Sequence, residues 1–172
     1  MELCVAYCQS EREGLVREGV RVKVIGRVED LPERVQAALA QLVEATSEVT
    51  GPTLCLAINY GSRREITDAV QGLARRVASG ELSASEIDEA AISAALDTAG
   101  LPDPDLLIRT AGEMRLSNFL LWQISYAELF VTETYWPDFN VADFHDAIRA
   151  FAARERRFGA RPDAPTSPAR PG

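Results

Sequence analysis

The sequence predicts an α/β protein with a parallel β-sheet flanked by helices. Two observations lead to this class: stretches with helical spacing of apolar residues alternate with short apolar runs of strand length, and turn residues separate them. Strands that are separated by helices are joined by right-handed crossovers, so they run parallel in one sheet. A chain of 172 residues, 47% hydrophobic and 26% charged, has enough apolar mass for one globular domain with a single core.

The first half of the chain is expected to form helices over residues 2–19, 31–46 and 64–78 and strands over residues 21–25 and 53–58. Gly19 ends the first helix, and Gly26 ends the strand RVKVI. Residues 31–46 carry their apolar side chains on one helical face. The run TLCLAI (53–58) is apolar almost throughout, as is typical of a strand that is buried on both faces.

The second half is expected to form a helix from Ser83 toward Leu96, strands over residues 105–108 and 129–132, and helices over residues 119–126 and 141–158. Ser83-Ala-Ser-Glu86 matches a capping box, in which the two side chains satisfy free amides at a helix start. Pro102 and Pro104 end that helix. Residues 160–172 are rich in proline, alanine and charge and are expected to be disordered, which leaves residues 1–159 as the domain.

The composition argues against several classes of protein. A net charge of −8 and a pI near 4.8 argue against a nucleic-acid partner. Three cysteines and one histidine do not supply a zinc site, so idle or buried thiols in a reducing cytosol are expected. No run approaches the roughly 18 apolar residues of a membrane span, and no secretory leader is recognisable, so a cytoplasmic location is expected.

Three loops are candidate ligand sites, because ligands of parallel sheets bind at the carboxyl ends of the strands. The segment Asn59-Tyr60-Gly61-Ser62-Arg63 follows the second expected strand. Arg109-Thr110-Ala111-Gly112 follows the third, and the chain from Glu133 onward follows the fourth.

The stretch from Arg109 to Glu128 has the residues of a phosphate site. Arg109 ends a buried strand, Arg115 follows six residues later, and Ser117-Asn118 stand where a helix is expected to begin. Free amides at a helix start, a hydroxyl and two arginines suit a phosphate or diphosphate. The alternative is an N-cap serine beside two arginines in surface ion pairs. Glu128 is a candidate Mg²⁺ ligand, with a salt-bridged surface glutamate as the alternative.

The run RTAGEMRLSNFLLWQISYAELFVTETYWPDF closely resembles the C-terminal signature of cis-prenyltransferases, the undecaprenyl diphosphate synthase family. INYGSRREI resembles the Asn-Tyr-Gly-x-Arg segment of that family, VKVIG resembles the strand before it, and ARERRFG resembles the end of its last helix. The resemblance covers about residues 1–159. It implies a reaction that condenses isopentenyl diphosphate with an allylic diphosphate and forms a Z double bond in each cycle.

The resemblance also implies roles for individual residues. It places Arg109, Arg115 and Ser117 on the diphosphate of isopentenyl diphosphate, Leu116 beside them as a further substrate-binding residue, and Glu128 on Mg²⁺. Asn59 and Arg63 support the substrate site and the dimer contact, although Asn-Tyr-Gly is also a common turn. Arg157 and Gly159 reach toward the partner subunit of a dimer. The lipid products imply that a cytosolic protein touches the membrane surface.

One part of the family pattern is absent from this sequence. The family carries Asp-Gly-Asn-Gly-Arg-Trp near its N-terminus, after a first strand, and neither that motif nor the first strands are found here. Three interpretations follow. The chain is a truncated form of a working enzyme, a non-catalytic partner subunit of a full-length homologue, or a degenerate remnant or one that uses another protein for the lost motif. A homodimer, or a heteromer with a full-length homologue, is expected.

Overall fold

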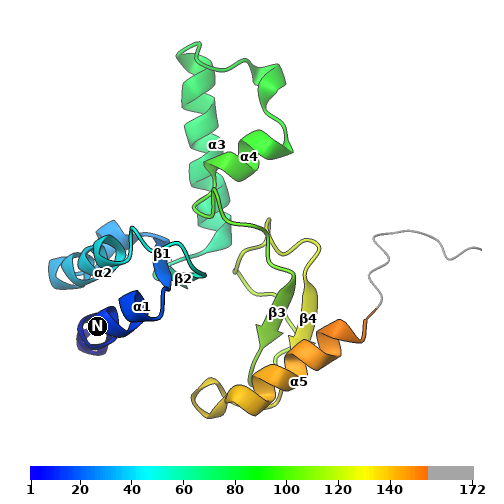
Figure 1. Cartoon of the computed structure of the whole chain (residues 1–172). Coiled ribbons are helices and arrows are strands. Elements are labelled where there is room, and N and C mark those ends of the chain that lie inside the picture. The colour runs from blue at the N-terminus through cyan, green and yellow to red at the C-terminus, as the bar shows by residue number, and fades with distance from the viewer. Residues whose placement is uncertain (155–172) are drawn as a thin grey trace, which may run out of the picture. The chain divides into compact units, whose positions relative to one another are not determined.

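The computed structural model describes residues 1–154, which form two compact units (Figure 1). The first unit comprises Met1–Pro104 and Arg115–Tyr126, and the second comprises Asp105–Met114 and the chain from Ala127 onward. The expected tail of residues 160–172 and the end of the expected last helix lie outside the described residues.

The first unit begins with α1 (Glu2–Arg17), β1 (Arg21–Ile25), the 3₁₀ helix η1 (Val28–Asp30), α2 (Glu33–Ala45) and β2 (Thr53–Ala57). The two strands pair in parallel, from Arg21 opposite Thr53 to Ile25 opposite Ala57. The expected order of helix, strand, helix and strand is therefore confirmed in this half of the chain.

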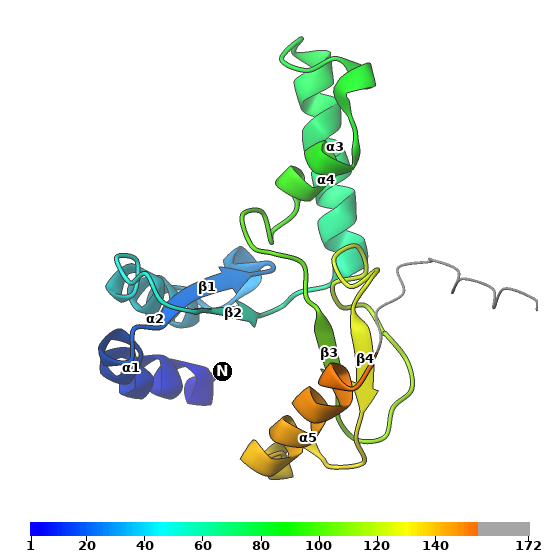
Figure 2. The same cartoon turned by 45° about the vertical axis from the view of Figure 1, so that its right-hand side comes forward.

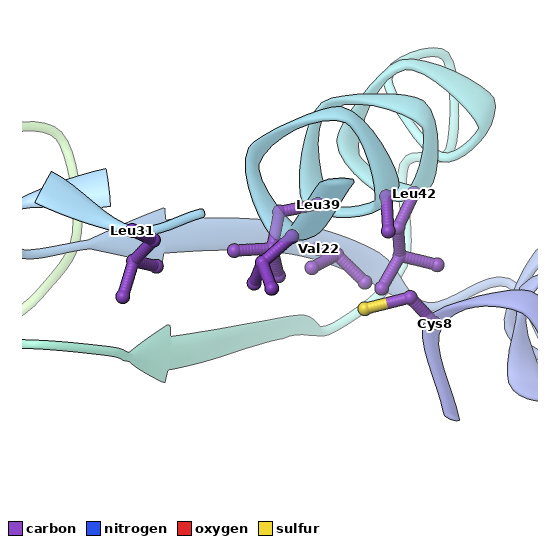
Figure 3. Packing of buried hydrophobic residues seen from close by; sticks show 7 residues of the cluster. Cys8, Val22, Leu31, Leu39 and Leu42 are labelled. Carbon is purple, nitrogen blue, oxygen red and sulfur yellow. The ribbon is translucent and has the colours of Figure 1, made fainter. Parts of the chain in front are cut away.

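A small apolar core joins α1 and α2 to β1. Figure 3 shows Cys8 of α1, Val22 of β1, and Leu39 and Leu42 of α2 gathered in one cluster. Leu39 is only 1% exposed, and burial of a leucine side chain contributes about 1.5–3 kcal/mol to stability. The apolar face that the spacing of residues 31–46 predicted is the face that is buried.

The rest of the first unit contains α3 (Ser62–Ala78), the 3₁₀ helix η2 (Ala84–Glu86) and α4 (Glu89–Ala95). Figure 2 shows α4 beside α3. The capping box at Ser83 and Glu86 is present, but it caps only η2. The helix α4 has its own cap, because the carboxylate of Asp88 accepts from the amide of Ala91 at 2.8 Å.

The second unit contains β3 (Leu106–Arg109), β4 (Glu128–Val131), the 3₁₀ helix η3 (Trp136–Asp138) and α5 (Val141–Ala152). The strands pair in parallel, from Leu106 opposite Glu128 to Arg109 opposite Val131. Figure 1 shows α5 alongside this pair. A capping box of Asn140 and Asp143 begins α5.

The α/β class with parallel strands is confirmed, but the predicted burial of the second strand is wrong. Each unit contains one parallel pair, β1–β2 in the first and β3–β4 in the second. β2 is not buried on both faces, because Thr53, Leu54 and Ala57 are exposed. Among residues 1–154, no helix combines the length and the apolar character that crossing a membrane requires.

The expected helix over residues 119–126 is a series of turns. Leu120 within this segment and Ser117 just before it have left-handed backbone angles, with φ of 47° and 61°, and such residues interrupt a right-handed helix. The amide of Leu121 donates to the hydroxyl of Ser62 at 2.9 Å. Hydrogen bonds to α3 thus replace the local helical pattern.

Candidate functional site

The start of α3 is bound to a distant residue, Asn118. The amide of Ser62 donates to the Asn118 carbonyl at 3.0 Å, and the amide of Arg63 donates to Asn118 Oδ1 at 2.8 Å. The next two amides of α3, those of Arg64 and Glu65, donate to the carbonyl of Gly61. All four N-terminal amides of α3 therefore have protein acceptors, which leaves no free amide there for an anion.

Close packing at Gly61 keeps Asn118 in this position. A Cβ atom at residue 61 would lie 2.8 Å from Asn118 Nδ2, so a side chain at residue 61 would displace the amide group. Ser62 is fully buried next to it. Asn118 thus acts as a cap for a helix that lies 55 positions earlier in the sequence, and it is not the start of a helix of its own.

The contacts of Asn118 bring two candidate segments together. Arg63 donates its amide to Asn118, and Ser117 and Leu116 directly precede Asn118 in the chain. The side chains of Arg63, Arg115, Leu116 and Ser117 are exposed. We call the start of α3 and residues 115–118 together the Asn118 corner. Because the helix amides already have acceptors, an anion that binds at this corner would contact the guanidinium and hydroxyl groups of these side chains.

Asn59 has a structural partner in the described chain. It adopts a φ of 51°, and its Nδ2 donates to the carbonyl of Arg27 at 3.0 Å. The amide of Arg27 donates in return to the Asn59 carbonyl at 3.3 Å. These bonds join the loops that follow β1 and β2, which agrees with the turn interpretation of Asn-Tyr-Gly. The role of Asn59 near a substrate stays a prediction.

Behind this corner lies a buried carboxylate that the sequence did not point to. Glu65 is 5% exposed and accepts from Tyr60 Oη at 2.6 Å, from the amide of Asp97 at 3.0 Å and from Gln123 Nε2 at 3.2 Å. Burial and the bond to Glu65 raise the pKa of the Tyr60 phenol above its ordinary value. Glu65 therefore connects α3 with three other segments of the first unit, and no local pattern distinguishes it from a surface glutamate.

In the second unit, Arg109 has a local anionic partner. It is the last residue of β3, its side chain is a quarter exposed, and its guanidinium forms an ion pair with Glu113. Ala111 and Gly112 have left-handed φ angles of 63° and 67°. Their amides donate to the carbonyls of Thr134 and Thr132, each at 2.9 Å, and so fold this loop onto the end of β4.

Glu128 lies at the other end of the same pair of strands. It is the first residue of β4, whereas Arg109 is opposite Val131, three residues further along. This register separates their backbones by about 10 Å along the strand. Arg154 Nη1 donates to Glu128 Oε2 at 2.6 Å, which is the arrangement of a salt-bridged glutamate. The rule that ligands bind at the carboxyl ends of strands therefore does not extend to Glu128.

The fit of Glu128 to Mg²⁺ depends on the other ligands. Within residues 1–154, no three His, Cys, Asp or Glu side chains are grouped closely enough to hold a metal. One partly exposed carboxylate still suits Mg²⁺, because this ion is often held by one or two carboxylates together with phosphate oxygens and water. Arg154 would have to release the carboxylate.

The candidate residues divide between the two units. Asn59, Arg63, Arg115, Leu116 and Ser117 belong to the first unit, and Arg109 and Glu128 belong to the second. Arg157 and Gly159 lie outside the described residues.

Comparison with known proteins identifies the relatives of this chain. The family model described as "Putative undecaprenyl diphosphate synthase" matches residues 1–159. Isoprenyl transferase of Agrobacterium fabrum is 49% identical over 160 residues, which are 93% of this chain and 65% of that protein. The ditrans,polycis-undecaprenyl-diphosphate synthase of Lactiplantibacillus plantarum, named as (2E,6E)-farnesyl-diphosphate specific, is 46% identical over 166 residues, which are 95% of this chain and 64% of that protein.

Solved structures agree with this assignment. Lavandulyl diphosphate synthase from Lavandula x intermedia, in complex with dimethylallyl diphosphate, is 37% identical with a TM-score of 0.90 over 92% of this chain and 69% of that chain. A probable undecaprenyl diphosphate synthase from Campylobacter jejuni is 35% identical with a TM-score of 0.78 over 92% of this chain and 72% of that chain. The chain spans slightly less than two thirds of the two curated relatives. Because the family model matches nearly the whole chain, the chain belongs to the undecaprenyl diphosphate synthase family.

Proposed function

We propose that this chain acts as a cis-prenyltransferase that condenses isopentenyl diphosphate with an allylic diphosphate to give Z-polyprenyl diphosphates. The observation that carries the proposal is the corner at Asn118. There, Arg63 at the start of α3 is bonded directly to the segment that contains Arg115 and Ser117. Cationic side chains and a hydroxyl on a backbone that is fixed by hydrogen bonds suit a diphosphate. The reaction itself is inferred from family membership.

The proposed binding residues stabilise the negative charge of the diphosphate groups. Arg109, Arg115 and Ser117 bind the diphosphate of isopentenyl diphosphate, Leu116 lies in the same segment, and Arg63 and Asn59 support the site. During the reaction the bond between the allylic carbon and its diphosphate breaks and diphosphate leaves with the electron pair. A new carbon–carbon bond forms to the isopentenyl unit, and that unit then loses a proton, which leaves the new Z double bond. Fixed cations near the diphosphates stabilise the negative charge without reorganisation, which is a large contribution to catalysis.

A metal is part of the same proposal. Glu128 would hold Mg²⁺, and the ion when bound would neutralise charge on the diphosphate oxygens. The proposal places the protein in the cytoplasm, with its lipid product bringing it to the membrane surface. It also assigns Arg157 and Gly159 to the interface of a homodimer.

A second candidate function is a non-catalytic partner subunit of a full-length cis-prenyltransferase. The 172 residues carry the family segment with Arg109 and Arg115 but not the Asp-Gly-Asn-Gly-Arg-Trp motif.

One assay separates the two candidates. Radiolabelled isopentenyl diphosphate, an allylic diphosphate and Mg²⁺ are incubated with the chain alone and with the full-length Agrobacterium relative. The enzyme proposal expects label in lipid product from the chain alone and loss of that label in Arg109→Ala. Arg149→Ala is the matched control, because Arg149 is an exposed arginine of the same unit that pairs with Asp146.

The partner proposal expects a different result from the same assay. The chain alone gives no product, but it raises the rate of the full-length relative when the two are mixed. A chain that neither forms product nor changes that rate contradicts both candidates.

A further inference from the structure

A hollow beside β1 in the first unit contains two cationic side chains. Its volume is about 510 Å³, and it is bordered by β1, the end of α2 and the loop that follows α4. The lining combines two cations, two hydroxyls and several apolar side chains, among them Arg21, Lys23, Ser47, Thr53, Val43 and Leu101. No aspartate or glutamate of residues 1–154 is part of this lining. The hollow shares no residue with the Asn118 corner.

Lys23 is the only lysine in the sequence. Its ammonium donates to the carbonyl of Ala99 at 2.8 Å. The turn that carries this carbonyl has a left-handed φ of 81° at Gly100 and a hydrogen bond from the Leu101 amide to the Thr98 carbonyl at 2.9 Å. A backbone carbonyl holds the ammonium in position but does not neutralise its charge, and an ammonium has two further N–H groups to donate.

Arg21 is held in the same way. Its Nε donates to the carbonyl of Val49 at 2.8 Å, and the two terminal nitrogens of a guanidinium can donate to other acceptors. Side chains two residues apart on a strand lie on the same face, so Arg21 and Lys23 start from Cα atoms about 6.6 Å apart. Among residues 1–154, neither cation forms an ion pair with a carboxylate.

The lack of a carboxylate partner is unusual in a chain with a net charge of −8. Elsewhere in the same unit, Arg27 and Arg64 both form ion pairs with Asp68. Arg21 and Lys23 instead have only backbone carbonyls as acceptors. Two like charges at this spacing repel each other, and an anion between them replaces the repulsion by attraction.

We propose that this hollow binds a phosphate monoester with a compact apolar body, at a site separate from that of the diphosphate substrates. A phosphate monoester carries close to two negative charges and three acceptor oxygens, which suit an arginine, a lysine and two hydroxyls better than the single charge of a carboxylate does. The apolar side chains of Val43 and Leu101 favour an apolar group on the ligand. The proposal concerns a second ligand and is independent of the proposed activity.

The single lysine allows the site to be followed without a label. Reductive methylation with formaldehyde and cyanoborohydride modifies primary amines, and mass spectrometry of peptides separates Lys23 from the N-terminal amine of the chain, which is the internal control. The rate is measured with inorganic phosphate, phenyl phosphate and benzoate at an ionic strength matched with sodium chloride. Each anion is titrated to about 20 mM, which covers millimolar dissociation constants.

Phenyl phosphate is expected to give the strongest protection. At about ten times its dissociation constant it should slow methylation of Lys23 roughly tenfold, because the reaction then proceeds from the small unbound fraction. Inorganic phosphate should protect Lys23 only at higher concentrations, since it makes no apolar contact, and benzoate should protect it least. The N-terminal amine should react at the same rate throughout.

A substitution tests whether both cations are needed. Arg21→Gln removes one charge but keeps a side-chain donor for the carbonyl of Val49, and we expect the protection by phenyl phosphate to weaken by roughly fivefold or more. Arg76→Gln is the matched control, because Arg76 is an exposed arginine of the same unit outside the hollow. Urea denaturation checks that both variants are folded. If Arg21→Gln is unfolded, Ser47→Ala takes its place, with a smaller expected loss of protection.

Several results would overturn the proposal. If neither phosphate compound slows methylation of Lys23 beyond the effect of matched sodium chloride, the two cations are only a solvated strand face. If the N-terminal amine is protected equally, or if protection survives Arg21→Gln, the anion does not bind between the two cations. If benzoate protects Lys23 as well as phenyl phosphate does, the site does not recognise a phosphate group.

Discussion

The loops that follow β2 and β3 both carry candidate arginines, but they are stabilised in opposite ways. After β2, the start of α3 depends on Asn118, 55 positions away, and on the buried carboxylate of Glu65. After β3, Arg109 pairs with Glu113, only four positions away, and the loop bonds to the adjacent end of β4. The first loop is therefore a product of long-range packing, whereas the second is stabilised mainly by neighbours in the chain and in the strand pair.

The two tryptophans allow this comparison to be measured. Trp122 belongs to the first unit and Trp136 to the second. In a Trp136→Phe background the fluorescence reports on the first unit, and in a Trp122→Phe background it reports on the second.

The largest effect is expected from Glu65→Leu. The substitution removes the acceptor for Tyr60, Asp97 and Gln123 and leaves these donors unsatisfied in a buried position. We expect the free energy of unfolding to fall by about 3 kcal/mol or more, measured by urea denaturation with Trp122 fluorescence. Gln71→Leu, at an exposed position of the same helix, is the control, and an equal loss there would remove the special role of Glu65.

A smaller effect is expected from Asn118→Ala, which removes the side-chain acceptor for the Arg63 amide. Loss of a helix cap costs about 1–2 kcal/mol, so the Trp122 transition moves to lower urea. Adding Gly61→Ala to Asn118→Ala then costs less than Gly61→Ala alone, because the contact with Asn118 Nδ2 is gone. Fully additive losses would show that Asn118 does not contact residue 61 in solution.

The Tyr60 phenol gives the next effect, as a function of pH. Its pKa is raised in the folded protein by burial and by the bond to Glu65, so the neutral form is favoured there. The resulting stability is fully present below the ordinary tyrosine pKa of about 10 and is lost as the pH rises above it. We expect unfolding free energy to fall above that pH in the wild-type chain and to fall less in Tyr60→Phe. Identical pH profiles would contradict the raised pKa.

The smallest effect is expected from Glu113→Ala in the second loop. Arg109 and Glu113 are both partly exposed, and ion pairs of this kind contribute about 0–1 kcal/mol. The Trp136 transition should therefore shift little, and the shift should shrink further in high salt. A loss as large as that of Glu65→Leu would show that the second loop is not stabilised locally after all.

Sequence patterns predicted much of the fold and part of the site. The apolar spacing of residues 31–46 identified α2 and its buried face, and short apolar runs identified β1 and β3. The helix predicted over residues 119–126 is wrong. Left-handed backbone angles at Ser117 and Leu120 and the hydrogen bond from Leu121 to Ser62 hold this segment in turns. For the same reason no helix begins at Ser117–Asn118, and Asn118 caps α3 instead.

By itself, the sequence determined the α/β class, the order of most elements and the resemblance to cis-prenyltransferases, because periodicity and motif spacing are local properties. Only the tertiary structure decided that Glu65 is buried, that Asn118 serves α3, and that Thr53, Leu54 and Ala57 of β2 are exposed. Each of these depends on which segments, far apart in the chain, compete for the same backbone groups. Long-range packing decides which side chains are buried and which backbone groups they bond to. A local sequence pattern does not contain this information.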